Sequence, residues 1–264
     1  MKPQPLVILG GRYTARWLLS LASSRYRTVR LSSRRPKQNL CDLPPDQCIE
    51  FDLLQRQTWA NVPHHADVVW CFPALPIDVV REFAATLSPF GRLVVLGSTS
   101  AYDISGEQTY PPPWTDETAS IDMKKPRAQG EEFLRIEQGA IVLRVAGIYG
   151  PGRNPLDWIK KGLIGPSRKY VNLIHVVDLA GICLSALKLG RAGEIYNVSD
   201  GTPRTWEEIC RVAHERWNVT SPAETVTQES GKRIDIRKLR EELRPQFRHP
   251  DLFTALEEII GGRQ

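Results

Sequence analysis

Short apolar runs alternate with amphipathic segments along most of the chain. Six runs of mainly apolar residues predict buried strands, at residues 6–9, 28–32, 48–51, 66–71, 92–96 and 140–145. The intervening segments 15–23, 77–87 and 126–137 carry apolar residues at helical spacing and predict helices. Continuous apolar strands separated by helices are typical of a parallel sheet whose two faces are both covered. The pattern therefore predicts an α/β protein with a doubly wound parallel sheet.

The first strand runs into a glycine turn. The sequence Gly10-Gly11-Arg12-Tyr13-Thr14-Ala15 follows it directly. A strand, a tight turn and a helix open a dinucleotide-binding unit, in which the helix N-terminus offers N–H groups and a positive dipole to a pyrophosphate. Such turns also occur without a ligand. The cofactor-binding residues predicted here are Gly10, Gly11, Arg12, Tyr13 and Thr14.

Arg12 departs from the usual glycine fingerprint. When the turn is aligned with G-x-G-x-x-G/A, Arg12 takes the second glycine position and Ala15 the third. A side chain there either crowds the pyrophosphate, so that Arg12→Gly tightens binding, or folds its guanidinium over the phosphates. The sequence favours the steric alternative and leaves the second open.

The end of the second strand bears on the choice of cofactor. An acidic residue there would bind the ribose 2′-hydroxyl of NAD, whereas arginine accommodates the 2′-phosphate of NADP. The segment 32–35 holds two serines and two arginines and no acid. We therefore expect NADP rather than NAD, with contacts from Ser33 and Arg34; a solvated basic turn is the alternative. Ligands of such sheets bind beyond the carboxyl ends of the strands. We expect one crevice to hold Gly10, Arg34, Asp52, Pro73 and Thr99.

Composition narrows the class of protein. The 264 residues suffice for one large domain, or a domain with an appendage, and the net charge is +5. No aromatic-interleaved nucleic-acid motif accompanies the basic clusters at 25–37 and 232–248, so we expect no nucleic-acid partner. The five widely spaced cysteines form no C-x-x-C pair and indicate reduced thiols. No apolar run approaches the length of a membrane span, and no metal-ligand motif is present. We expect a cytoplasmic protein with no membrane partner and no metal.

Three ordered segments carry a family resemblance. Residues 143–153 read Leu-Arg-Val-Ala-Gly-Ile-Tyr-Gly-Pro-Gly-Arg, residues 174–180 contain His-x-x-Asp, and residues 195–200 precede a Pro-x-Thr-x-x-Glu-Ile segment. Together they resemble the extended short-chain dehydrogenase/reductases, the NAD(P)-dependent epimerase/dehydratase family, and above all its short, atypical members. The resemblance implies a Rossmann-like domain at 1–149 plus 172–198. It also implies a small C-terminal cap on the substrate side, at 150–171 plus 199–264.

The resemblance also assigns roles around the crevice. Asp52 and Leu53 would contact the adenine. Pro73 and Ala74 would lie near the ribose, and Gly147 and Ile148 near the nicotinamide. Ser98 would contact the cofactor. Thr99 matches the hydroxyl residue at the end of the fifth strand and is the predicted catalytic residue.

The tyrosine of the family's Tyr-x-x-x-Lys pair has no counterpart. One register places Met123 and Arg127 at the two positions, and the other places Lys124 and Ala128 there. Tyr102 matches a structural tyrosine of the family. His175 and Asp178 match residues that pack and cap a helix start.

Two functions remain open at this point. The first is an NADP-dependent oxidoreductase or epimerase acting on a small, sugar-nucleotide-like substrate, with the proline-rich loop 103–120 as a candidate lid or a plain surface excursion. The second is a catalytically silent NADP-binding sensor or scaffold, which the absent tyrosine favours. Either would take a small-molecule substrate or effector and exist as a monomer or homodimer.

Overall fold

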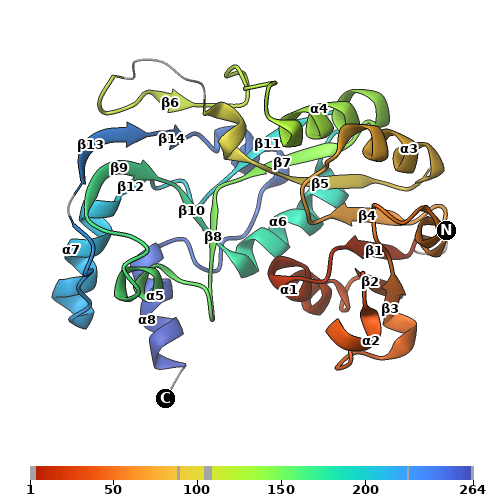
Figure 1. Cartoon of the computed structure of the whole chain (residues 1–264), viewed down its shortest axis with the longest axis horizontal. Helices are drawn as coiled ribbons and strands as arrows, with labels where there is room; N and C mark the ends of the chain where they lie inside the picture. Colours follow the sequence, from red (N-terminus) through yellow and green to blue (C-terminus); the bar gives the residue numbers. More distant parts are fainter. Residues whose placement is uncertain (1–3, 88–89, 104–108, 225, 263–264) are drawn as a thin grey trace.

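A seven-stranded parallel sheet forms the centre of the molecule (Figure 1). The computed structural model describes residues 4–87, 90–103, 109–224 and 226–262. The strand order is β11-β7-β5-β4-β1-β2-β3, and every pair is parallel. The strands are β1 Leu6–Leu9, β2 Val29–Ser33, β3 Cys48–Glu50, β4 Asp67–Trp70, β5 Leu93–Ser98, β7 Ile141–Val145 and β11 Ile195–Val198. The predicted doubly wound, Rossmann-like α/β fold is confirmed.

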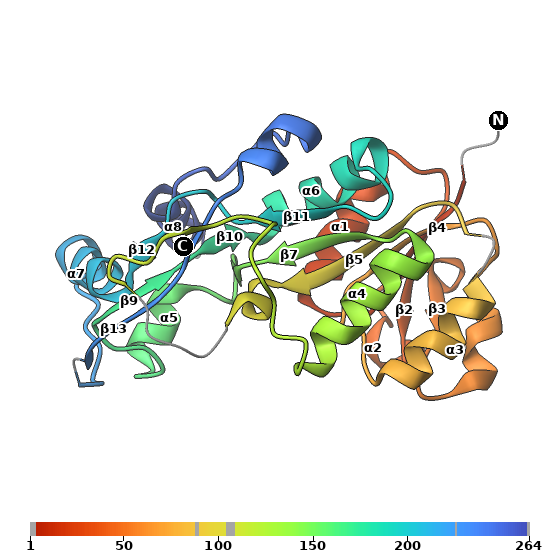
Figure 2. The ribbon, with the colours of Figure 1, turned by 90° about the horizontal axis from the view of Figure 1, so that it is seen from above.

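Helices cover both faces of this sheet. Figure 2 shows α3 (Ile77–Leu87) and α4 (Pro126–Gln138) on one side, with α1 (Tyr13–Ala22) and α6 (Val176–Leu189) on the other. Alternate residues of β1 pack into two separate cores: Ile8 with α1 and α6, and Val7 with α3 and α4. Because both faces are buried, β1 is apolar at every position, as the sequence pattern required.

A smaller unit lies at one end of the sheet (Figure 1). Its strand β9 (Ser167–Val171) pairs with β12 (Arg204–Thr205) and β13 (Val226–Gly231), while β8 (Gly147–Tyr149) pairs with β10 (Leu173–His175). The helices α5 (Pro155–Lys160), α7 (Trp206–Trp217) and α8 (Leu252–Gly261) pack there around a third apolar core. Most of its elements come from the ranges expected to form the cap, whereas β8 and β10 come from the ranges expected for the Rossmann-like domain.

The chain crosses back to the sheet after β13. Strand β14 (Arg233–Ile234) pairs with β6 (Trp114–Thr115), and Ile234, Ile236, Leu239 and Leu243 join the core beside α6. Residues of the range expected to form the cap thus complete the Rossmann core. The loop 103–120 was expected to lack secondary structure but contains β6; its residues 104–108 lie outside the described part of the chain. In the described residues, no helix is long and apolar enough to cross a membrane.

Candidate functional site

A crevice of about 750 Å³ opens beyond the carboxyl ends of β1 to β4. The sequence-predicted residues that line it are Gly10, Gly11, Arg12, Tyr13, Thr14, Ser33, Arg34, Asp52, Leu53 and Pro73. Two further residues that the sequence had connected with the cofactor also line it, Ser32 and Ile148. The other lining residues are Ala15, Asn39, Phe51, Cys71, Phe72, Leu75 and Arg153. The strand-end argument therefore located the crevice, which extends onto α2 (Pro36–Asn39) and the loop after β8.

The glycine turn is held tightly against β2. The backbone N–H of Gly10, which has a φ of +103°, donates to Ser32 Oγ at 2.8 Å. A Cβ on Gly11 would lie 2.9 Å from the Ser32 carbonyl oxygen, so only glycine fits there without a shift. Arg12, by contrast, has ordinary extended backbone with φ −90° and ψ −165°. The two consecutive glycines supply the close approach, and position 12 does not require a third.

The N-terminus of α1 lies at the crevice, and no acidic side chain of the helix itself neutralises it. Arg12 is the N-cap residue and makes no side-chain cap, and the first turn contains no acidic residue. The first N–H groups of a helix have no partner within the helix. The Tyr13 hydroxyl donates to the carbonyl oxygen of Pro151 at 3.0 Å, and burial raises the pKa of Tyr13 to about 12. The hydroxyl therefore remains protonated and fastens α1 to the loop after β8.

Arginine side chains outnumber acidic side chains among the residues that line the crevice. Arg12, Arg34 and Arg153 are exposed there, and their guanidinium groups have no ion-pair or hydrogen-bond partner in the described residues. Asp52 is the one acidic residue among those lining the crevice, and it accepts hydrogen bonds from its own turn, including Leu54 N at 3.1 Å. The wall therefore carries a net positive charge suited to an anionic ligand.

The β2 end of the crevice combines hydroxyl and amide groups. Ser33 Oγ accepts hydrogen bonds from Arg35 N at 3.2 Å and from Asn39 Nδ2 at 2.9 Å. Its own O–H remains able to donate to a ligand. Asn39 comes from the short helix α2. The sequence pattern gave no sign that this helix packs against β2, because four residues are too few to show a helical period.

An apolar wall faces this polar edge. Phe72 follows β4, and its Cδ1 lies 3.1 Å from the place where Gly10 would carry a Cβ. Phe51, Leu53 and Leu75 also line this part of the crevice. The sequence placed Pro73 at this strand end and missed Phe72, which the same strand-end signal would have found.

Three predicted site residues are not among those lining the crevice. Ser98 Oγ accepts a hydrogen bond from Ser100 N at 3.2 Å, and the Thr99 carbonyl oxygen accepts one from Lys232 Nζ at 3.0 Å. Gly147 is exposed, and its N–H donates to the Asn172 carbonyl oxygen at 3.0 Å. The structure places these residues beyond the crevice, on the β5 and β8 side.

Two lysines meet at the end of β5. Lys232, whose side chain is 19% exposed, forms an ion pair with Asp103, and Lys125 Nζ lies 3.5 Å from the same carboxylate. Burial lowers the pKa of Lys232, while Asp103 opposes the shift. Sequence reasoning missed Lys232 because it belongs to the segment that returns from the cap, far along the chain from Thr99.

The helix α4, which corresponds to the helix with the family's Tyr-x-x-x-Lys pair, has a structural role at this position. Arg127 Nε lies 2.7 Å from Glu131 Oε1, and its Nη2 donates to the Leu96 carbonyl oxygen at 2.7 Å. Burial raises the pKa of Glu131, although Arg127 acts in the opposite direction. Arg127 is thus engaged in tying α4 to β5. Tyr102 is buried and donates to Asn197 Oδ1 at 2.7 Å, in keeping with its expected structural role.

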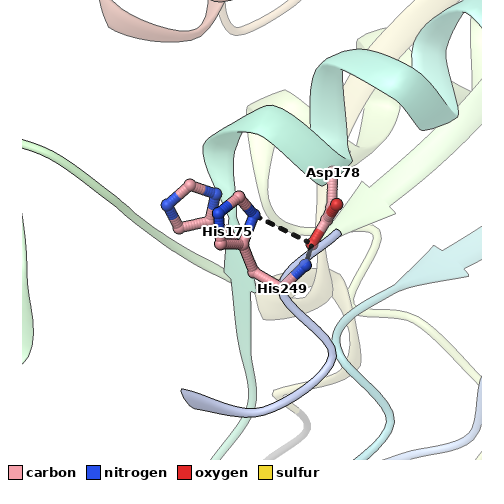
Figure 3. A group of neighbouring side chains, drawn as sticks. All are labelled: His175, Asp178 and His249. Carbon is pink, nitrogen blue, oxygen red and sulfur yellow. Dashed lines mark hydrogen bonds and ion pairs between the residues drawn. The ribbon is translucent and has the colours of Figure 1, made fainter. Parts of the chain in front are cut away.

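Two histidines and an aspartate lie close together at the N-terminal end of α6 (Figure 3). His175 is the N-cap residue of α6, and its Nδ1 accepts a hydrogen bond from Val177 N at 3.3 Å. Asp178 accepts the backbone N–H groups of Arg248 at 2.7 Å and His249 at 3.0 Å. These contacts agree with the capping and packing roles expected of His175 and Asp178.

His249 completes a trio with metal-ligating side chains. The ligand atoms of His175, Asp178 and His249 lie within 4.8 Å of one another. The two rings are stacked, with centroids 3.7 Å apart and planes 32° apart. Stacked rings direct their in-plane lone pairs side by side, whereas a bound metal requires these lone pairs to converge on one point. Burial, together with His249, lowers the pKa of His175 to about 4, so this ring is neutral. The cluster as arranged fastens the C-terminal segment to α6.

Comparisons with known proteins agree with this architecture. No family model matches the chain. Protein YeeZ of Escherichia coli K12 is 29% identical over 177 residues, and the match spans 61% of this chain and 59% of the relative.

Similar solved structures cover nearly the whole chain. A conserved protein of unknown function from Silicibacter pomeroyi is 22% identical, with a TM-score of 0.76 over 98% of this chain and 99% of its own. A putative NAD-dependent epimerase/dehydratase from Methylobacillus flagellatus is 20% identical, with a TM-score of 0.76 over 100% and 99%. A short-chain dehydrogenase/reductase superfamily protein from Agrobacterium tumefaciens, solved with bound NAD, is 14% identical, with a TM-score of 0.79 over 98% and 97%. The chain therefore has the fold of the extended short-chain dehydrogenase/reductases.

Proposed function

We propose that the protein binds a nicotinamide dinucleotide in this crevice and prefers NADP to NAD. The observation that carries the proposal is the unpaired Arg34 guanidinium at the end of β2, where no carboxylate stands. An acid at that point would repel a 2′-phosphate, whereas a free guanidinium binds it with charge-assisted hydrogen bonds. The NAD bound to the similar protein from Agrobacterium tumefaciens supports this class of ligand.

The residues around the crevice fit such a group. The residues at the N-terminus of α1 line the crevice, where a pyrophosphate would meet the first N–H groups of the helix. Ser33 and Arg34 would hold the phosphorylated ribose, and Leu53 and Phe72 would flank the adenine. Asp52 would approach the adenine edge.

The second part of the proposal concerns the reaction that the protein would catalyse with the bound dinucleotide. We place first an oxidoreductase or epimerase activity on a small, sugar-nucleotide-like substrate, with the nicotinamide supplying hydride chemistry when bound. Thr99 would orient the substrate at the end of β5. No phenol accompanies it on α4, where Arg127 is tied to Glu131, and a positioned general acid contributes roughly 10² to 10⁴ in rate. This engagement of Arg127 favours the second candidate, a catalytically silent NADP-binding sensor or scaffold.

Calorimetric titration with NADP and NAD tests the cofactor proposal. We expect tighter binding of NADP in the wild type and loss of that preference in Arg34→Ala. Arg35→Ala is the matched control, because Arg35 is also exposed and basic but is not among the residues lining the crevice. Equal affinities in the wild type, or a preference for NAD that survives Arg34→Ala, contradict the proposal.

A further inference from the structure

Arg12 stands in the wall of the crevice without strain. Its extended backbone suits any residue, and its side chain is exposed and unpaired within the described part of the chain. The contact that demands glycine falls on Gly11, whose Cβ would meet Ser32. No contact among the described residues therefore demands a glycine at position 12.

A second guanidinium is carried by a loop fastened to the same helix end. Gly150 and Arg153 exchange two backbone hydrogen bonds, of 2.8 and 3.0 Å, which close a tight loop. Tyr13, the residue after Arg12, holds that loop through Pro151. A Cβ on Gly150 would lie 2.6 Å from the Tyr13 hydroxyl, so the two segments are closely packed. Arg153 is thus held near the N-terminus of α1 and lines the same crevice as Arg12.

The charges nearby distinguish these two arginines from an ordinary basic surface. Arg16, one turn further along α1, is neutralised by Asp42 at 2.5 Å. Among the described residues, no carboxylate forms an ion pair with Arg12 or Arg153. The first turn of α1 adds unpaired N–H groups and contains no acidic residue. Free guanidinium groups beside a helix N-terminus match a ligand with two adjacent phosphates.

We propose that Arg12 and Arg153 form a guanidinium clamp on the pyrophosphate of the dinucleotide, in place of the backbone approach that a second fingerprint glycine provides. The inference rests on the proposed function, and it assigns the clamp to Arg12, which stands at a fingerprint glycine position, and to Arg153 of the loop after β8. Two forked guanidinium groups give charge-assisted, directional contacts that lysine cannot reproduce.

Two probes separate the clamp from the rest of the site. NADP contains the pyrophosphate, whereas adenosine 2′-monophosphate keeps the adenine, ribose and 2′-phosphate and lacks it. We expect Arg12→Gly and Arg153→Ala each to weaken NADP binding about tenfold or more, and to leave the affinity for adenosine 2′-monophosphate unchanged. Arg34→Ala should weaken both ligands. Arg12→Lys should fall between the wild type and Arg12→Gly.

Controls keep failure of the clamp distinct from failure of the cofactor proposal. Arg27→Ala removes an exposed arginine that does not line the crevice, and it should bind both probes as the wild type does. Thermal unfolding verifies that each variant is folded. NADP affinity in the wild type should also fall more steeply with salt than in Arg12→Gly. Equal or tighter NADP binding by Arg12→Gly overturns the clamp even where the wild type binds NADP, whereas no binding by the wild type rejects the proposed function itself.

Discussion

Gly11→Ala tests whether the contact between the glycine turn and β2 builds the crevice. The added Cβ would lie 2.9 Å from the Ser32 carbonyl oxygen and 3.1 Å from Leu40 Cδ2. Leu40 can adjust its side chain, but the Ser32 carbonyl belongs to the central sheet. The turn must therefore move away from β2, and the hydrogen bond from Gly10 N to Ser32 Oγ moves with it.

The size of the effect follows from this overlap. Inserting a methyl group into a packed contact costs about 1–3 kcal/mol. For a chain of this size each 1 kcal/mol shifts Tm by roughly 2–4 °C, so a cost of about 2 kcal/mol lowers Tm by roughly 4–8 °C. NADP affinity should fall as well, because the helix N-terminus moves together with the turn.

Differential scanning calorimetry with and without NADP measures both effects. Gly181→Ala is the matched control: Gly181 lies within α6, and its Cβ would meet only Leu21 Cδ2 of α1 at 4.0 Å, an ordinary contact. Alanine is favoured over glycine in a helix by about 1 kcal/mol, so this variant should unfold at a higher temperature. A Gly11→Ala protein that matches the wild type in both Tm and NADP affinity would refute the reasoning.

Further predictions concern the core, the pH dependence and the thiols. Tyr102→Phe leaves Asn197 Oδ1 without its donor and should lower the free energy of unfolding by about 1–3 kcal/mol, with no change in NADP affinity or in any turnover; an activity that collapses in this variant would make Tyr102 catalytic. Because burial raises the pKa of Glu131, the folded protein binds its proton more tightly than the unfolded chain does, and the stability due to this group declines as pH rises from about 4. Urea unfolding from pH 4 to 8 should therefore show Glu131→Gln gaining stability relative to the wild type, and a constant difference would contradict this. A thiol reagent should modify exposed Cys41 in the folded protein faster than half-buried Cys71, whose pKa burial raises well above its usual value; equal or faster labelling of Cys71 would contradict this.

The fold followed from the sequence because its strands are buried on both faces. Uninterrupted apolar runs such as residues 6–9 and 93–96 mark such strands without any knowledge of their partners. Strand-end reasoning found Arg34 and Asp52 for the same reason, since the carboxyl ends of parallel strands share one edge. The sequence pattern did not predict the two-residue strands β6 and β14, because they pair with each other from segments far apart in the chain.

The site residues that the sequence did not predict are brought into place by contacts between distant segments. Asn39 approaches β2 through a four-residue helix, and Lys232 reaches Thr99 from the segment after the cap. His249 stacks on His175 in the same way. Thr99 itself was expected in the crevice from its strand end, but it begins a turn on the β5 side and does not line it. The hydrophobic period of a segment indicates which of its residues are buried. It does not indicate which side chains from distant segments contact them.

A crystal structure of the protein with NADP tests the central claim most directly. The account predicts the pyrophosphate at the N-terminus of α1 between Arg12 and Arg153, and the 2′-phosphate beside Arg34. Density for the dinucleotide elsewhere, or an empty crevice in crystals grown with saturating NADP, would contradict it.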